Sequence, residues 1–166
     1  MENIKSKADS EIQPELVLDK AFESFTSMLK DNSIKSYIEG YSQYSDVSKL
    51  TNAINTERIE LQVKVQKFFI DKLHGEMRNR NGQTIADASK KSIHRMMAIY
   101  ETERMRSYNW GAYNGLVDAG ESTYDVYDTT KMTIIDNRKI SDSKYYDLPP
   151  DHPNSKVTIR KANESK

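Results

Sequence analysis

The residues best suited to chemistry lie in the stretch Ile99–Gly120, IYETERMRSYNWGAYNGLVDAG. Two acids, Glu101 and Glu103, stand beside two bases, Arg104 and Arg106. Paired carboxylates can work as general acid and general base. Residues two apart point to different faces of a helix, however, so these two acids do not form a close pair. A partly buried Glu103 needs a charge partner, and Arg106 lies one turn away. The spacing predicts structural ion pairs and no catalytic residues.

The aromatic residues of this stretch have two interpretations. Tyr100, Tyr108, Trp110 and Tyr113 would stack on nucleic-acid bases if they lined one face. Helical spacing spreads them around the axis, which favours packing of Trp110 and Tyr113 on the other helices. The aromatic residues are therefore expected to be architectural.

Small and polar residues in the same stretch also suggest close packing. Gly111 and Gly115 are one turn apart, and each costs a helix up to about 1 kcal/mol. The approach of another backbone is a sufficient reason to tolerate that cost. Asn109 is expected to hydrogen-bond a neighbouring turn, and Gly120 to end the helix in a left-handed conformation.

No sequence motif indicates a metal, a nucleotide or a cofactor. The chain has no cysteine, and its histidines (His74, His94 and His152) have no ligand spacing such as HExxH. The patterns GxxxxGK[ST], GxGxxG and GxSxG are also absent. We expect neither a metal site nor a cofactor.

The bulk composition predicts one hydrophilic domain. The chain has 166 residues, of which 36% are hydrophobic and 30% charged, and its mean hydropathy is −0.81. This supports a thin or elongated core that partners help to complete. No apolar run approaches the roughly 20 residues of a membrane span, and the first residues do not resemble a signal peptide. We expect a soluble protein made in a cytoplasm.

The charge is balanced overall but not locally. The chain has 25 basic and 25 acidic residues, yet residues 58–106 hold 11 bases and 6 acids, a local net charge of +5. A solvated helical face is the simpler interpretation. The alternative is contact with nucleic acid, which needs a basic surface. The candidate contact residues are Lys64, Lys67, Arg78, Arg80, Lys90, Lys91 and Arg95.

Hydrophobic periodicity predicts helices over the first two thirds of the chain. After a flexible arm at 1–13, a helix should run from Pro14 to about Lys30, and a break at Asn32 should precede a second helix capped by Ser33. A longer pattern over 46–77 has two apolar stripes, as expected for a helix contacted from two sides. A turn at 78–83 follows.

The rest of the chain predicts one long helix and a small sheet. The helix should run from Ile85 toward Asp118, and three β-rich runs follow it: TYDVY, MTIID and KVTIR. The expected fold class is α+β: a mainly helical body with one long central helix and a small C-terminal antiparallel β element. The expected regions are the 1–13 arm, a helical region at 14–83, a long helix with a β and loop element at 84–160, and a tail at 161–166.

Two motifs resemble a known family. The residues Thr102-Glu103-x-x-Arg106-x-x-Asn109-x-Gly111, followed by Gly120, resemble the T-E-x-x-R-x-x-N-x-G helix of phage Mu F-like minor head (head-morphogenesis) proteins. In that family a short β segment, an acidic-x-Arg turn and a loop ending P-P-x-H-P-N-C-R-C follow the helix. The similar segments here are 136–138 (Asp-Asn-Arg) and Pro149-Pro150-Asp151-His152-Pro153-Asn154. The resemblance covers roughly residues 84–160.

The chain departs from the family pattern at its cysteines. Ser155 and Val157 stand where the last two family cysteines would be, so no cysteine-dependent metal site or crosslink can form. The tryptophan that usually precedes the acidic-x-Arg is absent, and Met132 or Tyr124 stands in that region.

The resemblance implies a virion component with no enzymatic activity. Relatives are minor capsid proteins at the portal vertex and head interior, with roles in head assembly and in DNA packaging or delivery. It implies portal or capsid proteins as partners, packaged DNA as a further contact, and a homo-oligomer in the virion, made in the cytoplasm of a bacterial host. The residues expected to hold the fold are Thr102, Glu103, Arg106, Asn109, Gly111, Gly120, Pro149, Pro150, His152, Pro153 and Asn154.

Two other functions stay open from the sequence. A nucleic-acid-binding accessory protein would use the basic region 58–106. An enzyme would have to bring Glu103 and His152 within hydrogen-bond reach of one pocket.

Overall fold

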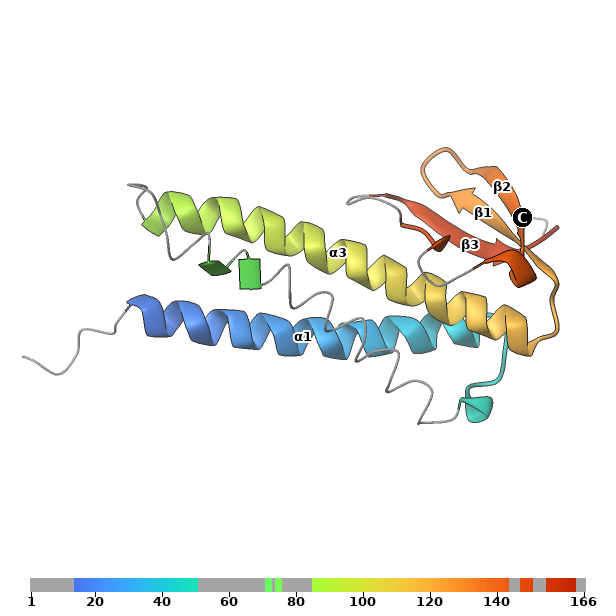
Figure 1. Cartoon of the computed structure of the whole chain (residues 1–166), viewed down its shortest axis with the longest axis horizontal. Coiled ribbons are helices and arrows are strands. Elements are labelled where there is room, and N and C mark those ends of the chain that lie inside the picture. The colour runs from blue at the N-terminus through green and yellow to red at the C-terminus, as the bar shows by residue number, and fades with distance from the viewer. Residues whose placement is uncertain are drawn as a thin grey trace, which may run out of the picture.

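The computed structural model describes residues 14–50, 71–72, 74–75, 85–143, 147–150 and 155–163. Two long helices, α1 (Pro14–Ser42) and α3 (Ile85–Asp118), lie side by side, and a small sheet packs on the C-terminal half of α3 (Figure 1). The sheet has three antiparallel strands in the order β2-β1-β3. The predicted α+β class, a mainly helical body with a small antiparallel element, is confirmed.

Helix α1 is one continuous helix where the sequence predicts two. The predicted break at Asn32–Ser33 is wrong: the Asn32 amide donates to the Met28 carbonyl one turn back, and Ser33 is 1% exposed on the side facing α3. The predicted break depended on capping preferences, which contribute less free energy than burial along a whole helix. Here the packing of α1 on α3 decides the outcome.

Three glycines let the two helices approach closely. A Cβ built on Gly111 would lie 1.9 Å from the Tyr37 carbonyl oxygen, and one on Gly115 would lie 2.6 Å from that of Tyr41. The contacts advance in the same direction along both helices, from Tyr37 with Gly111 to Tyr41 with Gly115. The two helices therefore run parallel (Figure 1). The predicted role of Gly111 and Gly115 is confirmed. Gly40 on α1 does the same against Tyr108, and this was not predicted.

The buried apolar residues form two clusters along the helix pair. The first joins Phe22, Phe25 and Leu29 of α1 to partly buried residues in the N-terminal half of α3. The second lies at the other end, where α3 is covered by α1 on one side and by the sheet on the other. Its members are Tyr37, Trp110, Ala112, Leu116, Tyr124, Val126, Leu148 and Ile159.

Polar contacts also hold α1 against α3. The Tyr41 hydroxyl donates to Asp118 (2.5 Å), and the Asn114 amide donates to the Tyr37 hydroxyl (3.0 Å). Burial, followed by this hydrogen bond to Asp118, raises the pKa of Tyr41. The neutral phenol that donates to the carboxylate is therefore the favoured form.

Helix α3 ends as predicted. Gly120 has φ +78°, and its N–H bonds the Val117 carbonyl while the Glu121 N–H bonds that of Leu116. This is the Schellman pattern, in which a glycine satisfies the last helical carbonyls. The chain then turns directly into the first strand.

The three predicted strands are confirmed as β1 (Thr123–Asp128), β2 (Thr133–Lys139) and β3 (Val157–Lys161). β1 is central and buries Tyr124 and Val126 against α3. The predicted tail begins one residue too early, because Lys161 is the last residue of β3. The segment joining β2 to β3 crosses back through Leu148, Pro149 and Pro150, all buried.

Several predictions fall outside the described residues. These are the arm at 1–13, most of the two-striped pattern over 46–77, the turn at 78–83 and the region boundary at 83/84. At the start of that pattern, Asp46 caps a short 3-10 turn, Val47–Lys49, through the Ser48 N–H.

Candidate functional site

Asn109 joins three separate segments of the chain. It lies on α3 and is 0% exposed. Its amide nitrogen donates to the Pro149 carbonyl (2.9 Å) and the Val157 carbonyl (3.1 Å). Its amide oxygen accepts the Ile159 N–H (3.1 Å) and the Thr158 hydroxyl (2.8 Å). A carboxamide has two donors and two lone pairs, so Asn109 is fully satisfied.

The side-chain amide of Asn109 also binds backbone groups at the outer edge of β3, where a fourth strand would otherwise pair. Val157 and Ile159 flank Thr158, and their carbonyl and N–H are the groups that a strand beside β3 would bind. The side chain of Asn109 binds both groups. It therefore closes the outer edge of β3 and fixes the register of that strand on α3. The sequence predicted a bond to a neighbouring turn, and Pro149 provides it.

Glu103 and Arg106 form the predicted ion pair. Their side chains approach to 2.6 Å, and Glu103 is 7% exposed. The other guanidinium nitrogen of Arg106 lies 3.5 Å from the Pro150 carbonyl, at the limit of a hydrogen bond. A buried carboxylate is stable only with such a partner. The pair thus neutralises Glu103 and brings Arg106 against the proline segment.

The exposed neighbours of this pair behave differently. Glu101 and Arg104 pair at 3.4 Å with more than 40% of each side chain exposed, so solvent screens the interaction. Thr102 is buried, and its hydroxyl donates to the Ala98 carbonyl within the helix. Thr102 is therefore a helix-packing residue.

The aromatic residues of α3 pack as predicted, with one correction. Trp110 meets Tyr37 of α1 edge-on, with ring centroids 5.5 Å apart. Tyr113 was predicted to pack on another helix, but it faces the sheet. Its ring meets Tyr124 of β1, and its hydroxyl donates to the Ile140 carbonyl. The sequence could not indicate which side of α3 the sheet would cover.

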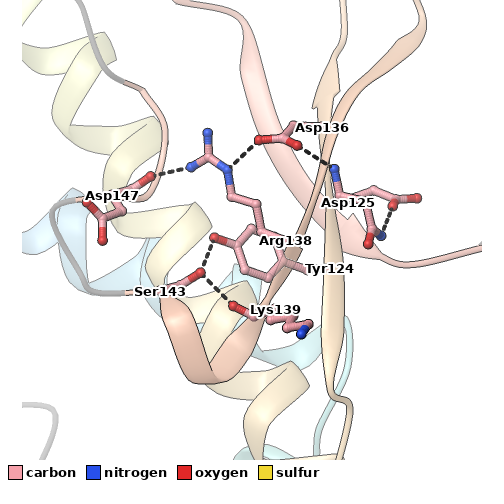
Figure 2. A network of polar contacts seen from close by, with 8 residues as sticks. Tyr124, Asp125, Asp136, Arg138, Lys139, Ser143 and Asp147 are labelled. Atoms are coloured by element: carbon pink, nitrogen blue, oxygen red, sulfur yellow. Dashed lines mark hydrogen bonds and ion pairs between the residues drawn. The ribbon is translucent and has the colours of Figure 1, made fainter.

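A second polar network ties β2 to the loop that follows it (Figure 2). Arg138 donates through Nε to Asp136 (2.8 Å) and through Nη1 to the Asp147 carbonyl (2.8 Å). The Tyr124 hydroxyl and the Ser143 hydroxyl lie 2.9 Å apart, and Ser143 also donates to the Lys139 carbonyl. The family resemblance implied a turn at 136–138, but these residues belong to strand β2.

Electrostatic shifts in this network follow from its contacts. Arg138, followed by the Asn137 N–H, lowers the pKa of Asp136. Asp136 in turn raises the pKa of Arg138. Both groups are thus charged near neutral pH. Their ion pair positions the Arg138 side chain, which also donates to the Asp147 carbonyl of the following loop.

Asp125 and Arg160 lie on the outer face of the sheet, and neither was predicted as a site residue. Asp125 is 3% exposed and accepts from the Asn137 amide (2.8 Å), while Arg160 lies 3.9 Å from its other oxygen. The Arg160 guanidinium also covers the Tyr127 ring at 4.3 Å. Only strand pairing brings these residues together, so no spacing in the sequence could reveal them.

The remaining predicted residues divide into two groups. Lys90, Lys91 and Arg95 are exposed on α3, away from the sheet. His152, Pro153 and Asn154, and the candidates Lys64, Lys67, Arg78 and Arg80, lie outside the described residues. The enzyme hypothesis, which needs His152 near Glu103, therefore also involves a residue outside the described part of the chain.

Within the described part of the chain, no group of three or more histidine, aspartate or glutamate side chains could hold a metal ion. No described helix combines the length and apolar character needed to cross a bilayer. Comparisons with protein-family models, with curated proteins and with solved structures find no match.

Proposed function

We propose that this chain is a minor capsid (head-morphogenesis) protein of a tailed phage or prophage and has no enzymatic activity. It binds portal or capsid subunits in the head interior and assists assembly, DNA packaging or delivery. This proposal starts from the sequence resemblance of the α3 motif and the Pro149–Pro150 motif to minor head proteins.

One observation carries the proposal furthest: the two motifs meet. Asn109 and Arg106 from the first motif bind the carbonyls of Pro149 and Pro150 from the second, about 40 residues away. Motifs that merely coincide by chance in a sequence have no reason to be in contact. Their contact supports one structural unit, as the family resemblance implies.

The chemistry of the motif residues supports a structural role. Glu103 is paired with Arg106, and all four hydrogen-bonding positions of Asn109 are occupied within the chain. Side chains that are used in this way fix geometry and are not presented to a substrate. The molecule would then act through the surfaces that this cluster positions.

Inactivating the gene in the phage or prophage that encodes it tests this function. We expect a loss of DNA-filled heads under the electron microscope, restored by the wild-type gene. Glu103→Ala should fail to restore them because it leaves Arg106 unpaired, whereas Glu101→Ala, which removes an exposed pair, should succeed. Normal yields of filled, infectious heads without the gene would refute the proposal.

Nucleic-acid binding is the second candidate function. Lys90, Lys91 and Arg95 are each exposed in the N-terminal half of α3, and phosphate contacts require basic side chains that solvent can reach. A duplex DNA binding assay at low and high salt tests this function, since counterion release weakens such binding steeply. Affinity that is absent, or that does not change with salt, would remove this candidate.

A further inference from the structure

Strand β2 is the open edge of the sheet. It is an outer strand in the order β2-β1-β3, and nearly all of its residues are exposed. The other outer strand, β3, has its edge bound by Asn109. In Figure 1, β3 is the strand that lies next to α3, and the β1–β2 hairpin lies farther from that helix. Among the described residues, β2 is thus the edge at which a further strand can add.

The direction of the backbone groups in β2 follows from its pairing with β1. The Ile140 N–H binds the Ser122 carbonyl, and antiparallel hydrogen-bonded pairs alternate along a ladder. Arg138 and Asp136 therefore direct their backbone groups to β1, and Asn137 and Lys139 direct theirs outward. In agreement, the Asn137 N–H donates to the side chain of Asp136 (2.9 Å).

The charges on this edge are self-complementary. If two β2 strands pair antiparallel with Asn137 opposite Asn137, Asp136 of each copy lies opposite Arg138 of the other. Shifting the centre by one residue would instead place Asp136 opposite Asp136, or Arg138 opposite Arg138. Charge thus favours the register centred on Asn137 over the registers on either side of it, and in this register the outward groups of Asn137 face each other.

Exposed apolar side chains adjoin this edge. Met132, Ile134 and Ile135 are 62%, 50% and 57% exposed at the tip of the hairpin and the start of β2. Large apolar side chains gathered on a surface mark interaction sites. Ile134 and Ile135 precede Asp136 in β2, so exposed apolar side chains lie beside the charged pair.

We propose that β2 is a self-association edge, on which a second copy of this chain adds antiparallel, centred on Asn137, to form one continuous six-stranded sheet. In the single chain, Arg138 and the Asn137 N–H both bind Asp136. When two copies pair, Asp136 gives up both contacts and binds Arg138 of the second copy instead. The released Asn137 N–H then donates to the Asn137 carbonyl opposite.

The association is weak in solution. A single strand pair with a few apolar side chains buries less than the roughly 1,200–2,000 Å² of a stable interface. It should therefore be measured over a range of concentration, up to the highest the protein tolerates. Holding several copies in one assembly would raise their local concentration and favour the same contact by mass action.

Sedimentation equilibrium of the purified full-length chain tests the proposal. The wild type should show reversible association toward twice the 19.2 kDa monomer mass. Asp136→Arg should be monomeric, because two arginine side chains would then face each other across the chains, and Arg138→Asp should be monomeric because two aspartates would. An equimolar mixture of the two variants should associate again, because opposite charges then face each other across chains.

Recovered association in the mixture would show that the opposite charges pair between chains. Mixing cannot restore the Asp136–Arg138 ion pair within one chain, because each variant lacks one of its two residues. Lys91→Asp, an equal charge reversal on exposed α3, should associate like the wild type. A wild type that stays monomeric at every concentration overturns the proposal, as does a mixture that remains monomeric although both variants show wild-type circular dichroism. The proposed function does not depend on this outcome, because only the purified chain is used.

Discussion

At the scale of single residues, Asn109 is the centre of the molecule's polar architecture. Its four hydrogen bonds bind both the Pro149 segment and strand β3, which pack beside α3. From the sequence, one bond to a turn could be predicted. The bonds to β3 could not, because they depend on where a strand 48 to 50 residues away docks.

Asn109→Asp tests this residue with almost no change of shape. A carboxylate donates no hydrogen bond, so the buried carbonyls of Pro149 and Val157 lose their donor and a charge is buried. We expect the free energy of unfolding in urea to fall by about 3 kcal/mol or more. Asn32→Asp is the control, since Asn32 makes the same type of bond in an exposed position. Equal effects of the two substitutions would contradict this role.

The aspartate of the hairpin turn predicts a dependence on pH. The N–H groups of Lys131 and Thr130 lower the pKa of Asp128. A carboxyl whose pKa is lower in the folded state stabilises the fold above its unfolded pKa, near 3.9, and loses that effect as pH falls through the folded pKa. Stability should therefore decrease in acid.

Asp128→Asn separates this contribution, because an amide oxygen accepts the same N–H groups without titrating. Urea midpoints at about pH 6 and about pH 2.5 should show a smaller acid loss for the variant than for the wild type. An equal or larger acid loss in Asp128→Asn would show that this carboxylate does not contribute.

At the scale of elements, the close contact between α1 and α3 defines the fold. The sequence predicts α3, its glycine end and all three strands, because each has a strong local signal: periodicity, a C′ glycine or a short β-rich run. It fails at Asn32 and Ser33, where tertiary packing overrides local capping. The sequence indicates Gly40 only as a weak helix former, because its partner Tyr108 lies on another helix.

Gly111→Ala tests the helix contact. In most helices this change stabilises by up to about 1 kcal/mol. Here the added Cβ would collide with the Tyr37 carbonyl at 1.9 Å. We expect instead a destabilisation of about 1–3 kcal/mol or more, as in other overpacked cores, measured by urea unfolding.

Gly75→Ala is the matched control. Gly75 has helical backbone, and a Cβ there would meet nothing within 4 Å. This substitution should leave stability unchanged or raise it. If Gly111→Ala also raised stability, the close approach of α1 and α3 would not exist in solution.

At the scale of the whole molecule, the sheet, the loop and both helices meet at one end of the helix pair, while the exposed bases Lys90, Lys91 and Arg95 lie toward the other (Figure 1). Composition predicted a thin core and a balanced charge. It could not predict where each surface lies, because that depends on the docking of the C-terminal segment on α3.

Locating the chain in a particle tests the proposed structural role in a phage head. Particles of the phage that encodes it should be purified, their tails and portal complexes separated, and the fractions analysed by quantitative mass spectrometry. We predict that the chain is present in mature heads, in few copies, and enriched with the portal fraction. Its absence from purified particles, with the chain abundant in the lysate, would contradict the claim.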